Sequence, residues 1–365
     1  MSDVPLRVSI VGSVGVPAKY GGWETLVEYL IQNLAESFQM TVYCSSKQYS
    51  ERLKYYNGAQ LEYVNLQANG IQSIFYDLMS MCRALNKADI ILVLGVSGCV
   101  FLPLLKKISS SKFIVNIDGI EWKRQKWGRI ASWFLKLSEQ VAINYADEIV
   151  ADNKAIQSYI LKTYNRSDSV LIEYGADHVS NEDIEASLRD TYPALNARYA
   201  FSVCRIEPEN NLDTILKSFS SQEGLPLIIV GNWDASVYGR KLRQEYHNGV
   251  DIFLVDPIYE LSTLNQLRSN CFLYIHGHSA GGTNPSLVEA MYLGLPIFAY
   301  NVEFNVETTY SSAVYFGNQA ELEYLIRSVD ELDLNELGLN MSKIAKKHYL
   351  WRNIARKYSD LILDL

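Results

Sequence analysis

Cysteine is scarce in this sequence, and the few cysteines form no recognisable pattern. They are odd in number and never stand closer than seventeen residues apart. That spacing excludes a paired disulfide framework and a C-x-x-C zinc pair. We therefore expect buried thiols in a reducing compartment. The five are Cys44, Cys82, Cys99, Cys204 and Cys271.

Long apolar runs and metal-binding clusters are also missing. No stretch approaches the roughly 18 apolar residues of a membrane span, and residues 1–10 lack the basic-then-apolar layout of a signal peptide. The five histidines form no zinc-spaced set, and we expect His276 and His278 to point opposite ways at a strand end. These absences predict a cytoplasmic protein, at most peripheral on the inner face of the cell membrane, with no bound metal and no cofactor.

Charge is distributed unevenly along the chain, whose net charge is -8. Residues 1–180 are nearly neutral, whereas 181–365 carry 15 basic against 24 acidic groups. Within the first half, residues 106–136 hold eight basic and two acidic residues with tryptophans interleaved. This segment suits an anionic membrane surface, and we expect no nucleic-acid partner. The alternative is a core-packing helix with a solvated side, above all for Trp133 and Phe134.

The pattern of apolar residues indicates two α/β domains. At 365 residues the chain is longer than one hydrophobic core usually supports. Strand-length apolar runs alternate with amphipathic helical stretches, as in a parallel sheet wound by helices. We expect two Rossmann-like doubly wound domains facing a central cleft, at 1–180 and 181–345, with a C-terminal helix in 346–365 packing back on the first. Strands are predicted at 6–11, 40–43, 90–94, 113–117, 148–151, 170–172, 199–204, 225–230, 252–255, 271–275 and 296–299, and helices at 24–36, 74–85, 101–108, 130–145, 212–219, 261–270 and 285–293.

A glycine-rich loop follows the first predicted strand and leads into a helix. It runs from Gly12 to Glu24 and lets backbone N–H groups approach an anion or a sugar. Gly12 and Gly15 are three residues apart, so the dinucleotide pattern G-x-G-x-x-G is absent, and no Walker sequence occurs. A nicotinamide enzyme and a P-loop kinase are therefore disfavoured. A plain strand-to-helix turn remains the alternative.

Two further loops follow predicted strands of the second half. Asn284 and Pro285 are suited to the N-cap and first position of a helix, whose free N–H groups would form a diphosphate cradle. Glu289 lies about one turn into that helix and could accept hydrogen bonds from ribose hydroxyls, unless it is a solvated helix glutamate. Arg205, at the end of another strand, could clamp a diphosphate or be an ordinary surface arginine.

These motifs together resemble a known family. Arg205 begins Arg-x-x-Pro-Glu-x-x-Leu-Asp, and some eighty residues later Gly282 begins Gly-Thr-Asn-Pro-Ser-Leu-Val-Glu-Ala-Met. This pair is similar to the donor-binding domain of family 4 retaining GT-B glycosyltransferases. Gly-Gly-Trp-Glu at 21–24, Ile-Gln-Ser-Ile-Phe-Tyr-Asp at 71–77 and Asp-Gly-Ile-Glu-Trp-Lys-Arg at 118–124 resemble the bacterial β-1,4-rhamnosyltransferase branch of polysaccharide assembly. The likeness covers essentially the whole chain.

Two positions depart from the family pattern. The family's paired glutamates, Glu-x7-Glu, would require a glutamate at 281, where this chain has Gly281, so only Glu289 remains. Asn210 occupies the usual position of a lysine beside Arg205. Both departures affect the contacts with the donor sugar and diphosphate.

The resemblance implies a metal-independent enzyme that moves a sugar from a nucleoside diphosphate to a saccharide on a lipid diphosphate. The expected donor is dTDP-L-rhamnose. The first domain would bind the acceptor and the second the donor, and each domain would contribute catalytic groups. The catalytic residues are expected to be Asp118, Arg205 and Glu289. Donor-binding residues are expected to be Gly15, Gly21, Gly22, Arg205, Asn210, His278, Gly281, Gly282, Thr283, Asn284 and Glu289, and acceptor-binding residues Glu24, Asp118, Glu121, Lys123 and Arg124.

Several alternatives stay open at this level. Asp118 could cap a helix before Gly119 instead of orienting the acceptor hydroxyl. The donor could be another UDP- or GDP-sugar. The chain could also be an epimerase or phosphorylase of the same fold, or a non-catalytic partner that only binds sugar nucleotides.

Overall fold

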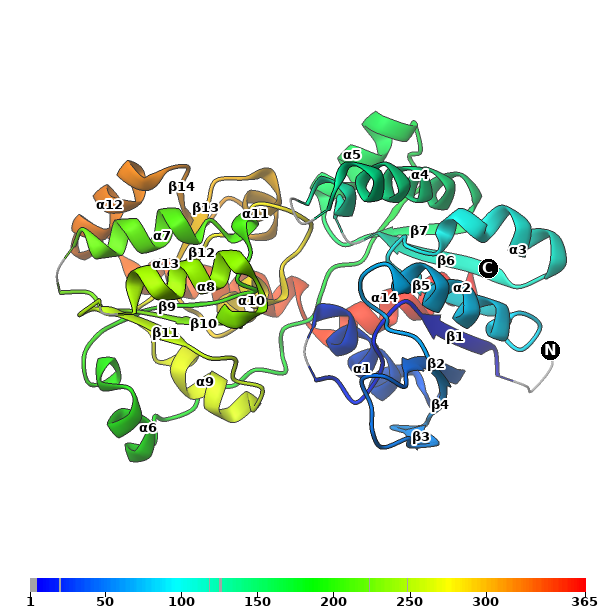
Figure 1. Cartoon of the computed structure of the whole chain (residues 1–365), viewed down its shortest axis with the longest axis horizontal. Coiled ribbons are helices and arrows are strands. Elements are labelled where there is room, and N and C mark those ends of the chain that lie inside the picture. Colours follow the sequence, from blue (N-terminus) through cyan, green and yellow to red (C-terminus); the bar gives the residue numbers. More distant parts are fainter. Residues whose placement is uncertain (1–4, 20, 118, 125–126, 223, 248) are drawn as a thin grey trace. The chain divides into compact units, whose positions relative to one another are not determined.

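The computed structural model describes residues 5–19, 21–117, 119–124, 127–222, 224–247 and 249–365. It divides into two compact units (Figure 1), here called unit 1 (Met1–Tyr174 and Trp351–Leu365) and unit 2 (Gly175–Leu350). The sequence-based boundary was placed after residue 180, within the segment that enters unit 2. Asp118 lies outside the described residues.

Unit 1 is built on an eight-stranded sheet in the order β3-β4-β2-β1-β5-β6-β7-β8. Only β3 is antiparallel to its neighbour; the other pairs are parallel. The strands are β1 (Arg7–Val11), β2 (Gln39–Ser45), β3 (Tyr55–Tyr56), β4 (Ala59–Val64), β5 (Ile90–Leu94), β6 (Lys112–Ile117), β7 (Glu148–Ala151) and β8 (Val170–Leu171). The helices are α1 (Gly22–Leu34), α2 (Gln72–Ala84), α3 (Leu102–Ile108), α4 (Arg129–Tyr145), α5 (Lys154–Tyr164) and α14 (Trp351–Leu363), with 3-10 turns η1 (Cys99–Phe101) and η2 (Glu121–Lys123).

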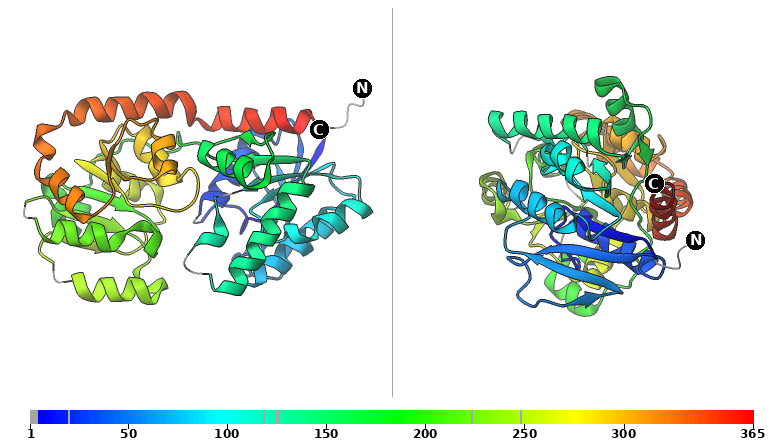
Figure 2. Two further views of the ribbon diagram at one scale, coloured as in Figure 1. Left: turned by 90° about the horizontal axis from the view of Figure 1, so that it is seen from above. Right: turned by 90° about the vertical axis from the view of Figure 1, so that its right-hand side faces the viewer.

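The last helix of the chain belongs to unit 1. Figure 2 shows α14, coloured red, beside the elements that form the start of the chain. Trp351 stacks on Tyr29 of α1 with ring centroids 4.7 Å apart. Asn116 donates a hydrogen bond from Nδ2 to the Tyr358 hydroxyl at 2.5 Å, and both residues are buried. These contacts join residues more than 240 positions apart and complete the hydrophobic core of unit 1.

Unit 2 is built on a six-stranded, all-parallel sheet in the order β11-β10-β9-β12-β13-β14. The strands are β9 (Ala200–Val203), β10 (Leu227–Val230), β11 (Ile252–Val255), β12 (Leu273–His276), β13 (Ile297–Tyr300) and β14 (Val314–Phe316). The helices are α6 (Ala186–Thr191), α7 (Leu212–Ser220), α8 (Val237–Tyr246), α9 (Leu261–Ser269), α10 (Pro285–Tyr292), α11 (Glu303–Thr308), α12 (Gln319–Arg327) and α13 (Leu334–His348), with 3-10 turns η3 (Pro193–Asn196), η4 (Pro208–Asn210), η5 (Trp233–Ala235) and η6 (Val329–Glu331).

Each sheet has one point at which the strand order reverses. In unit 1 the chain goes outward from β1 through β2 and returns to β5 on the other side, and in unit 2 the same happens at β9 and β12. In doubly wound folds, ligands bind beyond the carboxyl ends of the strands at this switch point. The prediction of two Rossmann-like doubly wound domains is confirmed.

The apolar runs become buried central strands because helices cover both faces of a parallel sheet. All four residues of β10 are almost fully buried. Some elements with weak patterns were not predicted from the sequence. One is α8, which is mostly polar and whose Ser236 N-cap accepts from Gly239 N at 3.0 Å. The pair β3 and β4, α5, α11, α12, α13 and β14 were also missed. One cysteine, Cys82, is exposed, against the expectation of buried thiols.

Candidate functional site

The loops after β9 and β12 lie together at the switch point of unit 2. The side-chain amide of Asn211 donates to Gly277 O at 2.8 Å. A Cβ at Gly277 would stand 2.1 Å from Asn210 O, so only glycine allows this approach. Ser279 donates from both its backbone N and its Oγ to Glu209 O, at 2.8 and 2.9 Å. The two predicted donor loops are therefore one hydrogen-bonded structure.

Asn210 links these loops and is buried. Its Nδ2 donates to Arg205 O at 2.7 Å, and its Oδ1 lies 2.9 Å from His278 Nδ1. Since an amide oxygen only accepts, His278 carries its proton on Nδ1. Both polar atoms of the Asn210 side chain thus form hydrogen bonds within the loops. Asn210 stands where the family has a lysine, and its amide holds the backbone at Arg205 in place.

Arg205 follows β9 and remains accessible, with 44% of its side chain exposed. Its Nε lies 3.9 Å from Glu207 Oε2, too far for a hydrogen bond. Such a loosely paired guanidinium at a strand end can offer its bidentate fork to a phosphate.

The helix α10 begins where the sequence predicted. Asn284 is the N-cap, and its Oδ1 accepts from Ser286 N at 3.0 Å, with Pro285 at the first helical position. Before it, Gly281 has φ +110°, a conformation that a glutamate would adopt only with strain. Thr283 is buried. The glycine that replaces the family glutamate therefore lies at a position whose backbone conformation favours glycine.

Glu289 of α10 is not the solvated helix glutamate considered as an alternative. Its carboxylate accepts from Arg268, which is fully buried on α9, and lies 3.1 Å from Nε2 of His178. Arg268 also donates from Nη2 to Asn265 Oδ1 at 3.0 Å. Burial by itself would raise the pKa of Glu289, but Arg268 and His178 outweigh it and lower that pKa to about 2. Glu289 is a fixed anion at neutral pH.

Arg268 and His178 were not predicted from the sequence. Arg268 stands in a helix of ordinary amphipathic pattern, and His178 lies in the irregular segment at the start of unit 2, 111 residues before Glu289. No local spacing connects the three. Their meeting is a property of the tertiary fold.

The expectation that His276 and His278 point opposite ways is wrong. Their ring centroids lie 6.1 Å apart, and His276 also stacks on Tyr274 at 6.3 Å. Residues i and i+2 of an extended chain share one face, so alternate positions bring side chains together. Burial lowers the pKa of His276 to about 3, and its Nε2 has no hydrogen-bond partner among the described residues. It is a neutral imidazole at the end of β12.

In unit 1 the glycine-rich loop is held by carboxylates of α1. Glu24 is buried and accepts from Val14 N at 2.8 Å, and Glu28 accepts from Ala18 N at 2.6 Å. Burial raises the pKa of Glu24, and the hydrogen bond from Val14 opposes this. Gly12, Gly15 and Gly21 all have φ between 95° and 131°. Gly22 is the first residue of α1. Glu24, predicted to bind the acceptor, here shapes the loop.

Three further residues predicted to bind the acceptor, Glu121, Lys123 and Arg124, lie in and beside η2. Arg124 is buried, and its Nε lies 2.8 Å from Glu121 Oε2, while Trp127 donates to Glu121 Oε1 at 3.0 Å. Lys123 Nζ stands 5.4 Å from the ring centre of Trp122. Glu121 and Arg124 thus neutralise each other, and Lys123 is exposed above an aromatic ring.

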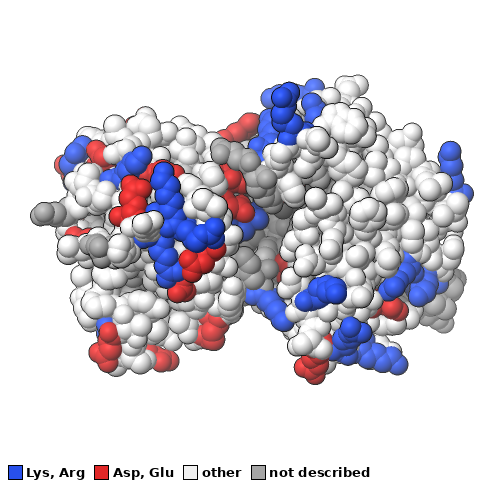
Figure 3. Space-filling model, viewed as in Figure 1, with Lys and Arg blue, Asp and Glu red and all other residues white. Residues whose placement is uncertain are grey.

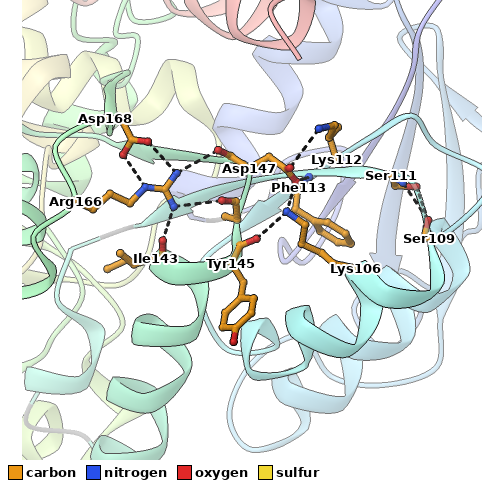
Figure 4. A network of polar contacts seen from close by, with 11 residues as sticks. Lys106, Ser109, Ser111, Lys112, Phe113, Ile143, Tyr145, Asp147, Arg166 and Asp168 are labelled. Carbon is orange, nitrogen blue, oxygen red and sulfur yellow. Dashed lines mark hydrogen bonds and ion pairs between the residues drawn. The ribbon is translucent and has the colours of Figure 1, made fainter.

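The basic segment 106–136 is less free than its sequence suggests. Lys106 and Lys112 pair with Asp147 at 2.9 and 3.5 Å (Figure 4). Arg166 donates to the carbonyls of Ile143 and Ala146 at the end of α4, which fixes that helix end. On the face drawn in Figure 3, Lys and Arg side chains of unit 1 form separate groups and no continuous field.

In the part of the chain that the structure describes, no group of three or more His, Cys, Asp or Glu side chains could hold a metal ion. Within the same residues, none of the helices combines the length and the apolar character that a membrane crossing requires.

Comparison with known families divides the chain as the units do. Residues 6–177 match a domain of unknown function, DUF1972, and residues 183–348 match the family described as glycosyl transferases group 1. An uncharacterized glycosyltransferase of Methanocaldococcus jannaschii is 23% identical over 246 residues, which cover 64% of this chain and 62% of that protein. The aligned part thus spans about three fifths of that relative.

Solved structures with the same fold cover nearly the whole chain. Sucrose-phosphate synthase from Thermosynechococcus elongatus matches with a TM-score of 0.79 and 16% identity, covering 98% of both chains. Anabaena HepE in complex with UDP-glucose matches with a TM-score of 0.77 and 14% identity, covering 99% of this chain and all of the other. A glycosyltransferase from Rickettsia africae matches with a TM-score of 0.73 and 12% identity, covering 99% and 98%. Residues 183–348 are therefore similar to the glycosyl transferases of group 1, and the two units have the GT-B fold.

Proposed function

We propose that this glycosyltransferase moves L-rhamnose from dTDP-L-rhamnose to a saccharide carried on a lipid diphosphate, with retention at the anomeric carbon, in bacterial surface polysaccharide synthesis. The observation that carries the proposal is the switch point of unit 2. There Arg205, the N-terminus of α10 and the anionic Glu289 all belong to the loops and helix that follow β9 and β12. The match to HepE, solved with UDP-glucose, supports a sugar nucleotide as donor.

Each part of this site suits one part of the donor. The exposed guanidinium of Arg205 and the positive end of the α10 helix dipole attract the diphosphate. Glu289 is held ionised and oriented by Arg268 and His178, and so can accept hydrogen bonds from ribose hydroxyls. A dTDP donor offers one free hydroxyl on its deoxyribose, and a UDP donor offers two.

In the proposed reaction the bond between the anomeric carbon and the diphosphate oxygen breaks, and the acceptor oxygen bonds to that carbon on the same face. The acceptor proton passes to a diphosphate oxygen or to a nearby base. We propose Asp118 for the base or orienting role on the resemblance alone. Arg205 and α10 stabilise the negative charge of the leaving diphosphate, which makes a metal ion unnecessary.

The rhamnosyl donor and family 4 membership rest on the resemblance of residues 21–24, 71–77 and 118–124 to the rhamnosyltransferase branch. A membrane-bound acceptor is supported by the surface of α4. Ile130, Trp133 and Leu137 lie one and two turns apart, and Ile130 is 85% and Trp133 66% exposed. Trp133 is therefore not a core residue, against the alternative interpretation. Exposed Arg129 and Lys136 accompany these apolar side chains, as on helices that lie in an anionic membrane interface.

A second candidate is a non-catalytic protein that only binds sugar nucleotides, and the glycine at position 281 favours it. The test is transfer by the purified protein from radiolabelled dTDP-L-rhamnose to a lipid-diphosphate saccharide. Thermal shift with dTDP-, UDP- and GDP-sugars first identifies the donor. Donor binding without hydrolysis or transfer would support the second candidate. Transfer from only a UDP- or GDP-sugar would replace rhamnose and leave the enzyme class standing.

A further inference from the structure

One buried carboxylate of the donor loops has no partner. The side chain of Glu209 is buried, yet neither Oε1 nor Oε2 has a hydrogen-bond partner among the described residues. Leaving a buried charged group unsatisfied is costly, and such groups are rare unless they have a function. Arg205, four residues earlier, lies 3.9 Å from Glu207 Oε2 and forms no hydrogen bond with Glu209.

The position of Glu209 connects it to both donor loops. It lies in η4, four residues after Arg205, and its carbonyl oxygen accepts both hydrogen bonds from Ser279. Ser279 is two residues before Gly281, where the backbone requires glycine and no carboxylate is available. The backbone of Glu209 is thus bonded to the segment in which position 281 has no carboxylate, and its own carboxylate is buried within these loops without a partner among the described residues.

The chemistry of the group limits what it can bind. A carboxylate accepts hydrogen bonds and repels a diphosphate, so its partners must be donors such as hydroxyl groups. The ribose hydroxyls are already assigned to Glu289. The remaining hydroxyls of a sugar nucleotide belong to the sugar that is transferred.

We propose that Glu209 recognises the donor sugar by accepting hydrogen bonds from its hydroxyl groups, and so determines donor specificity. This inference rests on the proposed function of the site. The carboxylate without a partner lowers the stability of the free protein, and hydrogen bonds from the bound sugar would remove this penalty. Functional sites in proteins are often less stable than they could be for this reason.

The test compares Glu209→Gln with wild type by calorimetry, using dTDP and dTDP-L-rhamnose as one pair and UDP and UDP-glucose as another. We expect affinity for the nucleoside diphosphate to change less than twofold and affinity for the sugar nucleotide to fall about tenfold or more, the scale of a hydrogen bond to a charged group. Glu331→Gln, an exposed glutamate of η6, is the matched control. Equal losses for both ligands, or no loss for either, would overturn the inference.

A second readout separates recognition from a structural role. Without ligand, Glu209→Gln and Glu209→Ala should melt higher than wild type, by about 2–4 °C, because the buried carboxyl group without a hydrogen-bond partner is gone. A lower melting temperature for both variants would show that Glu209 supports the fold and would overturn the inference. If wild type binds no sugar nucleotide from either pair, the proposed function fails as well, and that result is visible before any variant is measured.

Discussion

The buried ion pair between Arg268 and Glu289 allows a quantitative test of how the donor site is held. We consider Arg268→Met, which keeps the length of the side chain and removes its charge. Arg268 is fully buried and Glu289 has 15% of its side chain exposed. Removal of one partner from a buried pair costs about 3–5 kcal/mol. His178 Nε2 still lies 3.1 Å from Glu289 Oε1 after Arg268 is replaced, so we expect the lower end of this range.

The pKa of Glu289 reports the net effect of burial, Arg268 and His178 on the same carboxylate. It lies at about 2 in the folded protein against an ordinary value of 4.5. Because the folded pKa is depressed, the stabilisation is complete above pH 4.5 and is lost as pH falls from there toward 2. A difference of this size corresponds to about 3 kcal/mol, in agreement with the mutational figure.

The assay is urea unfolding of the full chain at pH 7 and at a series of values down to pH 3. We expect Arg268→Met to lower the free energy of unfolding at pH 7 by about 3 kcal/mol. The variant should also lack the decline in stability that wild type shows as pH falls below 4.5 in this series. The double variant Arg268→Met with Glu289→Gln should recover much of the loss, since no buried charge remains unpaired. A loss below about 1 kcal/mol, or no recovery in the double variant, would refute this account of the pair.

Three further predictions concern the proposed reaction and the proposed binding to membranes. Arg205→Ala should lower kcat/KM by an amount equivalent to about 2 kcal/mol or more, since a charged partner of the diphosphate is lost; an unchanged kcat/KM would make Arg205 an ordinary surface arginine. Sugar transfer should persist in EDTA because Arg205 and α10 stabilise the negative charge of the leaving diphosphate. Complete loss of activity in EDTA, with rescue by manganese, would contradict this. In liposome sedimentation, binding should require anionic lipid, fall with salt and weaken in Trp133→Ser and in Arg129→Gln. Equal sedimentation with neutral vesicles, or none with either, would exclude the membrane proposal.

Much of the fold could be predicted from the sequence because its signals are local. Buried parallel strands are short apolar runs, and Asn284 before Pro285 marks a helix start in the sequence and in the structure. The polar helix α8 has no such apolar pattern and was missed. Glycines at 12, 15, 21 and 281 indicated loops, and the structure gives each of them a positive φ.

The sequence by itself determined the α/β alternation, the two Rossmann-like domains and the loops that follow β9 and β12. Only the tertiary structure showed that Arg268 and His178 hold Glu289, that Asn210 is used to join two loops, and that Glu209 is buried without a partner. The reason is physical: a helix cap or a strand depends on neighbours a few residues away, whereas burial and ion pairing depend on which distant segments the fold brings together. The electrostatic state of Glu289 therefore could not be inferred before its partners, 21 and 111 residues away, were placed beside it.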